Sequence, residues 1–131
     1  ELDRAVVHIY WKDDEAEIFM DTSGPTLAKH GYRKIPGKAP MLEALATATV
    51  MASGWDQTSP FVNPMCGSGT LAIEAALLAT HRKPGLYRNN YSFMHWLGYE
   101  KSMYESALAA IQRQVKEVPV TIIASDLVQD A

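Results

Sequence analysis

A glycine-rich segment near the middle of the chain joins an apolar run to a helix-forming run. The segment is Asn63-Pro64-Met65-Cys66-Gly67-Ser68-Gly69-Thr70, with Phe61-Val62 before it and the helix-forming residues 71–79 after it. Its two glycines can adopt positive φ and allow a ligand to approach the backbone closely. Amides at the start of the following helix would point at an anionic or polar group. This succession predicts a nucleotide-type cofactor site.

The spacing of the glycines narrows the kind of ligand. Gly67, Gly69 and Ala72 fit the dinucleotide pattern Gly-x-Gly-x-x-Gly/Ala, which is a weak signal on its own. A triphosphate-binding loop is disfavoured, because that motif places a lysine before the Ser or Thr and no lysine precedes Thr70. A strand-to-helix turn that binds no ligand remains the alternative interpretation at this point.

A second candidate binding residue, Asp126, follows the apolar run 119–124. A carboxylate at the end of the second strand of a dinucleotide-binding fold accepts hydrogen bonds from ribose hydroxyls. The usual interval is about 20 residues, whereas Asp126 lies 54 residues after Ala72. The long interval makes a nicotinamide-dependent enzyme the less favoured alternative.

Cys66 is the single cysteine of the chain, and the four histidines are scattered. This composition excludes an internal disulfide and supplies no metal-binding spacing, so we predict no metal site. Covalent catalysis by Cys66 is disfavoured, because a nucleophilic cysteine needs an activating base beside it. We interpret Cys66 as a small side chain packed at the turn, Met65 as a core contact and Glu74 as a helix-surface carboxylate.

The remaining pattern predicts an α/β fold with one βαβ-type unit. Ala5 to Trp11 and Glu15 to Met20 alternate as an antiparallel hairpin would. Helices are expected at 41–52, 70–81 and 100–117, the first with Leu45, Ala48 and Ala52 on one face, the last with Met103, Ala107, Leu108, Ile111 and Val115 at helical spacing. The run 119–124 resembles a parallel strand covered on both faces, joined by a right-handed crossover.

Residues 82–99 contain five aromatic side chains and turn-forming Pro-Gly and Asn-Asn pairs. We expect an ordered insertion whose rings bury one another as a satellite core. A base-stacking surface is the alternative.

Composition sets the broad class and the expected partners. The chain has 131 residues, 47% of them hydrophobic and 21% charged, which suits one globular domain. It has no apolar run of membrane-spanning length and no signal sequence, so cytoplasmic residence is the default. The net charge of −3 argues against a generally basic nucleic-acid surface.

A local exception to the acidic balance is the stretch Thr22 to Leu42, which contains no acidic residue. Its cations are Lys29, Arg33, Lys34 and Lys38, which are candidates for contacts with RNA phosphates; a solvated charged loop is equally favoured. His81-Arg82-Lys83 and Arg88 form a second basic group, with Tyr87 and Tyr91 nearby.

The chain resembles the bacterial THUMP-containing RNA methyltransferases of the RNA methylase family. The motifs that carry the likeness are, in order, Asp21-Thr22-Ser23-Gly24, Leu27, His30-Gly31-Tyr32-Arg33, Ala39-Pro40 with Glu43, the loop 63–70 with Ile73-Glu74-Ala75-Ala76, and Pro84-Gly85-Leu86. Their ordered succession over nearly the whole chain is more specific than any single motif. Within the family, the amino-terminal methylase half of the 23S rRNA guanine-N2 methyltransferases is the most similar.

The resemblance implies the amino-terminal part of a Rossmann-like S-adenosylmethionine-dependent methyltransferase with an incomplete parallel sheet, acting on guanine N2 of RNA, expected to be 23S rRNA. It implies that residues 1–24 form the trailing edge of a THUMP or linker region and residues 25–131 the truncated methyltransferase domain. The cofactor would contact Asn63, Pro64, Cys66, Gly67, Ser68, Gly69 and Thr70 at its methionine end and Asp126 at its ribose, with Ala39, Pro40 and Glu43 closing the pocket.

Three departures from the family pattern bear on function. Asn63 stands where an aspartate is more common, and Leu42 stands where a basic residue is common. The family's later Asn/Asp-Pro-Pro-aromatic motif, which holds the target amine, has no counterpart, because the chain contains no Pro-Pro dipeptide. We therefore assign no catalytic residue and expect no catalysis by this chain alone. An RNA-binding or interaction module without a cofactor stays an alternative, as does self-association of the incomplete sheet.

Overall fold

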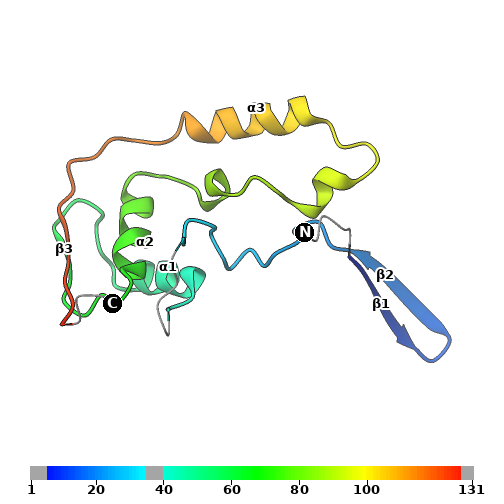
Figure 1. Ribbon diagram of the computed structural model, residues 1–131, viewed down its shortest axis with the longest axis horizontal. Coiled ribbons are helices and arrows are strands. Elements are labelled where there is room, and N and C mark those ends of the chain that lie inside the picture. Colours follow the sequence, from blue (N-terminus) through cyan, green and yellow to red (C-terminus); the bar gives the residue numbers. More distant parts are fainter. Residues whose placement is uncertain (1–5, 35–39, 128–131) are drawn as a thin grey trace.

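A computed structural model describes residues 6–34 and 40–127 of the chain. At the amino-terminal side, β1 (Val7–Lys12) and β2 (Glu15–Met20) pair in antiparallel register from Val7 opposite Met20 to Lys12 opposite Glu15. Asp13 takes a positive φ of 53° in the two-residue turn, as tight hairpins require. The hairpin projects from the rest of the chain with both faces exposed (Figure 1). Its prediction is confirmed over the described residues; Ala5 lies outside them.

The core lies between α1 (Glu43–Ala52) and α2 (Thr70–Ala79). Its buried apolar residues are small or aliphatic: Ala46, Val50, Ala72, Ala75, Leu77 and Ala79. The helical prediction is confirmed, but the predicted buried face of the first helix is wrong. Leu45 is 56% exposed, and Glu43, Ala46 and Val50 are buried instead. The inward face carries polar side chains with partners: Glu43 bonds to His30, and Thr47 bonds to Glu74 of α2.

Two short strands form a parallel pair, as predicted. β3 (Phe61–Asn63) pairs with β4 (Ile122–Ala124), with Asn63 opposite Ala124 at the carboxyl ends. The prediction that the second strand spans 119–124 and is covered on both faces is wrong: α2 contacts both strands, but Val62 is 60% and Ile123 51% exposed.

The aromatic segment between α2 and α3 (Lys101–Gln112) is ordered around two 3₁₀ turns, Pro84–Tyr87 and Ser92–His95. Tyr91 stacks on Phe93 with ring centroids 5.3 Å apart, and Tyr99 and Tyr104 pack against Phe93. The satellite core is therefore confirmed. α3 is shorter than the predicted 100–117, and none of its residues is fully buried; it runs along one side of the structure, apart from α1 (Figure 1).

Candidate functional site

The glycine-rich loop is tied to both strands where they end. The amide of Ser125 donates to the carbonyl of Asn63 at 3.0 Å, and the amide of Cys66 donates to the carbonyl of Ser125, also at 3.0 Å. These bonds continue the parallel pairing beyond β3 and β4. They bring the loop and the residues after β4 to the same edge of the sheet, where α/β folds bind ligands.

Two glycines set the path of this loop. Gly67 has φ of 51° and Gly69 has φ of 78°, a region that side chains with a Cβ rarely occupy. A Cβ built on either glycine would meet no atom within 4 Å. Glycine is therefore needed here for backbone conformation, and the space beside the loop is open. Gly69 is the N-cap of α2, and no side chain caps that helix, so its first amides face the loop.

Asp126 lies against this loop, as its position after the second strand predicted. One of its carboxylate oxygens accepts a hydrogen bond from the Gly67 amide at 2.8 Å. A carboxylate oxygen has further lone pairs beyond the one used for this bond. The Asp126 side chain is exposed, so the site has an accessible anion at the edge of the loop.

A pocket of about 190 Å³ lies beside the loop and is lined by Pro40, Met41, Met65, Cys66, Gly67, Ser68, Thr70 and Leu71. Five of the residues predicted to contact the cofactor therefore line one pocket: Pro40, Cys66, Gly67, Ser68 and Thr70. Pro64 is exposed outside this lining. Asn63 is buried behind it, with an amide nitrogen that has no hydrogen-bond partner among the described residues. Ala39 and Lys38 lie outside the described residues.

The loop holds its two sulfur-containing side chains differently. Met65 is 85% exposed, so its prediction as a core contact is wrong; the loop turns this side chain outward. Cys66 is half-buried, and its thiol contacts the carbonyl of Gly67 at 3.4 Å, as expected for a small side chain at the turn.

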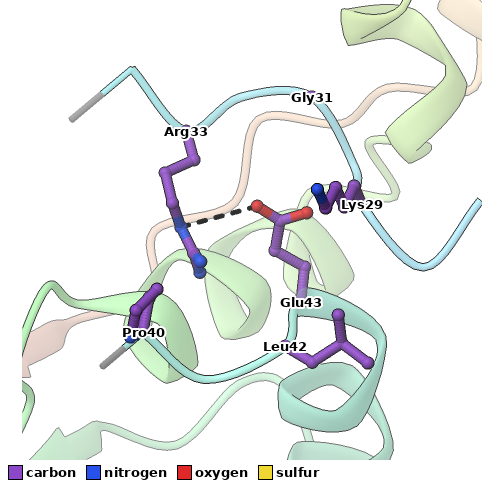
Figure 2. A pocket seen from close by; sticks show the side chains of 6 residues that line it. All are labelled: Lys29, Gly31, Arg33, Pro40, Leu42 and Glu43. Atoms are coloured by element: carbon purple, nitrogen blue, oxygen red, sulfur yellow. Dashed lines mark ion pairs between the residues drawn. The ribbon is translucent and has the colours of Figure 1, made fainter. Parts of the chain in front are cut away.

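A larger pocket, of about 430 Å³, adjoins the first and shares Pro40 with it. Its lining is Lys29, Gly31, Arg33, Pro40, Leu42 and Glu43 (Figure 2). Glu43 thus lies in the wall of this second pocket, not of the one beside the loop. Its buried carboxylate accepts a hydrogen bond from the backbone amide of His30.

Arg33 connects the two pockets. Its guanidinium donates to the carbonyl of Met41 at 2.8 Å and to the hydroxyl of Thr70 at 2.9 Å. It also forms an ion pair with Glu43, with nitrogen and oxygen 3.6 Å apart (Figure 2). Arg33 therefore joins the segment before α1 to the first residue of α2. Its positive charge is paired with the Glu43 carboxylate.

Glu74 is the functional-site neighbour that sequence reasoning misassigned. It is 1% exposed, not on the helix surface, because three groups hydrogen bond to its carboxylate. They are the hydroxyl of Tyr32 at 2.7 Å, the ring nitrogen Nδ1 of His30 at 2.8 Å and the hydroxyl of Thr47 at 2.6 Å. Burial and the Glu74 carboxylate raise the pKa of Tyr32. One feature of the sequence indicates this burial: after Thr70, every residue of α2 except Glu74 is apolar, and a helix that is apolar all round is usually buried.

Two other kinds of feature are not found among the described residues. None of the described helices combines the length and apolarity needed to cross a bilayer. No group of three or more His, Cys, Asp or Glu side chains in the described ranges is arranged to hold a metal ion.

Several solved structures resemble this chain along almost its full length. SMU.472, a predicted methyltransferase in complex with S-adenosylhomocysteine (SAH), has 32% identity and a TM-score of 0.83 over 95% of this chain. A predicted N6-adenine-specific DNA methylase from Listeria monocytogenes str. 4b F2365 has 34% identity and a TM-score of 0.83 over 93%. A possible methylase from Clostridium difficile 630 has 29% identity and a TM-score of 0.80 over 96%.

The matched region is a small part of each of these proteins. This chain covers 32%, 32% and 33% of their respective lengths. Over that region the chain has the α/β fold of these methyltransferase structures. Residues 30–131 also match the family described as RMKL-like, methyltransferase domain, and the chain therefore belongs to this methyltransferase family.

Proposed function

We propose that this chain is the cofactor-binding part of an S-adenosylmethionine-dependent RNA methyltransferase that modifies guanine N2, with 23S rRNA as its substrate. The observation that carries the proposal is the bond between Asp126 and the amide of Gly67, which sets a carboxylate beside the glycine loop at the carboxyl edge of two parallel strands. The 32% identity to SMU.472, a structure with bound SAH, supports the choice of cofactor.

The residues present fit such a cofactor in their chemistry. The open space beside Gly67 and Gly69 allows close approach to the loop backbone. The uncapped first turn of α2 suits polar groups of the methionine end. The pocket of about 190 Å³ is below the roughly 300–1,000 Å³ of typical ligand pockets, and we therefore propose that the described residues supply one wall of the site.

In this proposal the chain's residues bind and orient, and the bound cofactor supplies an electrophilic methyl group on a sulfonium. Cys66, Gly67, Ser68 and Thr70 hold the methionine end, Asp126 accepts hydrogen bonds from the ribose hydroxyls, and Pro40 closes the opposite side. Glu43 acts indirectly, because its carboxylate is engaged by His30 and Arg33. Methyl transfer to an amine is chiefly a positioning task, and the groups that hold the acceptor base are expected in other parts of the full-length protein.

Replacing Asp126 with alanine in the full-length protein tests the cofactor site. We expect SAH affinity to fall about 10- to 100-fold, because hydrogen bonds to a charged group contribute about 1.5–3 kcal/mol each. Isothermal titration calorimetry measures the change. Asp126→Asn keeps an acceptor for the Gly67 amide and should lose less. Asp14→Ala, in the exposed hairpin turn, is the control. If Asp126→Ala binds SAH as tightly as the wild-type protein does, Asp126 does not hold the ribose hydroxyls.

The acceptor is tested separately. The similar Listeria protein is named as a predicted DNA adenine methylase, so DNA adenine N6 is the second candidate acceptor. The full-length enzyme would be given methyl-labelled S-adenosylmethionine with either rRNA or DNA, and the modified nucleosides identified by mass spectrometry. N2-methylguanine in rRNA supports our proposal; N6-methyladenine in DNA contradicts it. A ribosomal RNA substrate would place the enzyme in the cytoplasm. In the same proposal, the hairpin is the trailing edge of a THUMP or linker region.

A further inference from the structure

Positive charge is segregated in this chain. Two stretches, 22–42 and 75–99, contain none of the 15 Asp and Glu residues. They contain seven of the 12 Lys and Arg residues: Lys29, Arg33, Lys34, Lys38, Arg82, Lys83 and Arg88. The chain as a whole has a net charge of −3, so its remaining residues are strongly acidic. Such segregation is typical of a surface with a polyanionic partner.

The fold brings the two acid-free stretches together. A Cβ on Gly31 would lie 3.2 Å from the carbonyl oxygen of Tyr87, and the rings of Tyr32 and Tyr87 meet edge to face with centroids 6.4 Å apart. The Arg88 guanidinium donates to the carbonyls of Ser23 and Pro25 at 2.9 and 2.8 Å. Segments more than 50 residues apart therefore form one continuous region.

The cations of this region divide into two kinds. Arg33 and Arg88 are half-buried and bond to the protein, as described above for Arg33. Lys29, Lys34, Arg82 and Lys83 are exposed and form no ion pair with any described residue. We call these four side chains the basic surface. Lys38 belongs to the same stretch but lies outside the described residues.

Carboxylates near the basic surface do little to neutralise it. Glu43 and Glu74, which contact the 30–33 segment, are buried and hydrogen bonded. Glu117 lines a pocket together with Arg82, so the test below uses the three lysines and leaves Arg82 unchanged. Tyr87, next to Arg88, is 37% exposed and offers a ring on which a base can stack.

We propose that the basic surface, with Tyr87, binds the phosphate backbone of the RNA substrate. This inference rests on the proposed function, which makes RNA the acceptor. Position supports it as well as charge: Lys29 lines the larger pocket, which shares Pro40 with the pocket beside the glycine loop. RNA held at Lys29 and Lys34 would thus lie next to the candidate methyl-donor site. Contacts with phosphates position a nucleic acid without reading its sequence.

The test compares two triple variants of the full-length protein that remove equal charge. The surface variant carries Lys29→Gln, Lys34→Gln and Lys83→Gln; the control carries Lys12→Gln, Lys101→Gln and Arg113→Gln, all exposed positions outside the two stretches. RNA affinity is measured by fluorescence anisotropy at several salt concentrations. Since each phosphate contact contributes about 0.7 to the salt slope for single strands, we expect the surface variant to lose about two from that slope and at least about tenfold in affinity.

The readouts separate this inference from the proposed function. SAH affinity should be the same in both triple variants, while the KM for RNA rises in the surface variant and kcat holds. If the surface variant binds and methylates RNA as the control does, the basic surface is overturned and the proposed function stands. If the wild-type protein neither binds nor methylates RNA, the basic surface and the proposed function are both contradicted. Tighter binding of DNA of the same sequence, lost in the surface variant, would overturn RNA as the partner.

Discussion

Replacing Glu74 with alanine is expected to lower the local free energy of unfolding by about 3–5 kcal/mol. The carboxylate is 1% exposed and accepts hydrogen bonds from His30, Tyr32 and Thr47. Alanine would leave these three donors without their acceptor and would open a cavity beside α2. Hydrogen exchange of the full-length protein measures the effect, with faster exchange expected in residues 30–34 and 70–79.

Two further variants show whether the loss comes from the hydrogen bonds. Glu74→Gln keeps the size of the side chain and one acceptor oxygen, so its loss should be smaller than that of alanine. Glu105→Ala removes an exposed carboxylate from α3, and such surface changes usually stay within about 0.5 kcal/mol. Unchanged exchange in Glu74→Ala would contradict the central role assigned to this carboxylate.

Replacing Arg33 with methionine is expected to weaken SAH binding by about tenfold and to destabilise the 30–43 region by about 2 kcal/mol. Methionine keeps the apolar stem but removes the donors that reach Met41 and Thr70, both of which line the pocket beside the glycine loop. Charge-assisted hydrogen bonds of this kind contribute about 1.5–3 kcal/mol. Calorimetry with SAH measures affinity, and hydrogen exchange measures stability. Lys34→Met, at an exposed neighbouring position, is the matched control.

A double variant separates the two effects of Arg33. Arg33→Met leaves the buried Glu43 carboxylate without its cation, which is itself destabilising. Adding Glu43→Gln neutralises that charge, so stability should partly recover. SAH affinity should stay low in the double variant, since the bonds to Met41 and Thr70 are still missing. If affinity recovers together with stability, Arg33 acts only through Glu43, and its direct ordering of the pocket is disproved.

Local patterns in the sequence were sufficient to predict the parts of the fold that depend on neighbouring residues. The hairpin, the glycine loop and the start of α2 each follow from turn residues and propensities within about ten positions. The meeting of Asp126 with the loop also followed, because parallel strands end at the same edge of a sheet.

Partners distant in sequence were not predictable in this way. Glu74 looked like a surface residue because its acceptor role depends on His30 and Tyr32, more than 40 positions earlier. The buried face of α1 was misassigned for the same reason: apolar spacing selected Leu45, whereas Glu43 and Thr47 are held inward by hydrogen bonds. Periodicity counts apolar side chains and therefore misses a buried polar face.

The bond between Gly67 and Asp126 links ligand affinity to the pairing of β4 with β3. The strand β4 is three residues long and exposed or half-buried, and α3, which precedes it, has no fully buried residue. A ligand that contacts both the loop and Asp126 would bind only the paired arrangement. At a concentration 100 times its dissociation constant, such a ligand stabilises that arrangement by about 2.7 kcal/mol. By reciprocity, any substitution that destabilises the pairing of β4 with β3 should weaken ligand binding by the same free energy. This holds even for a position that does not contact the ligand.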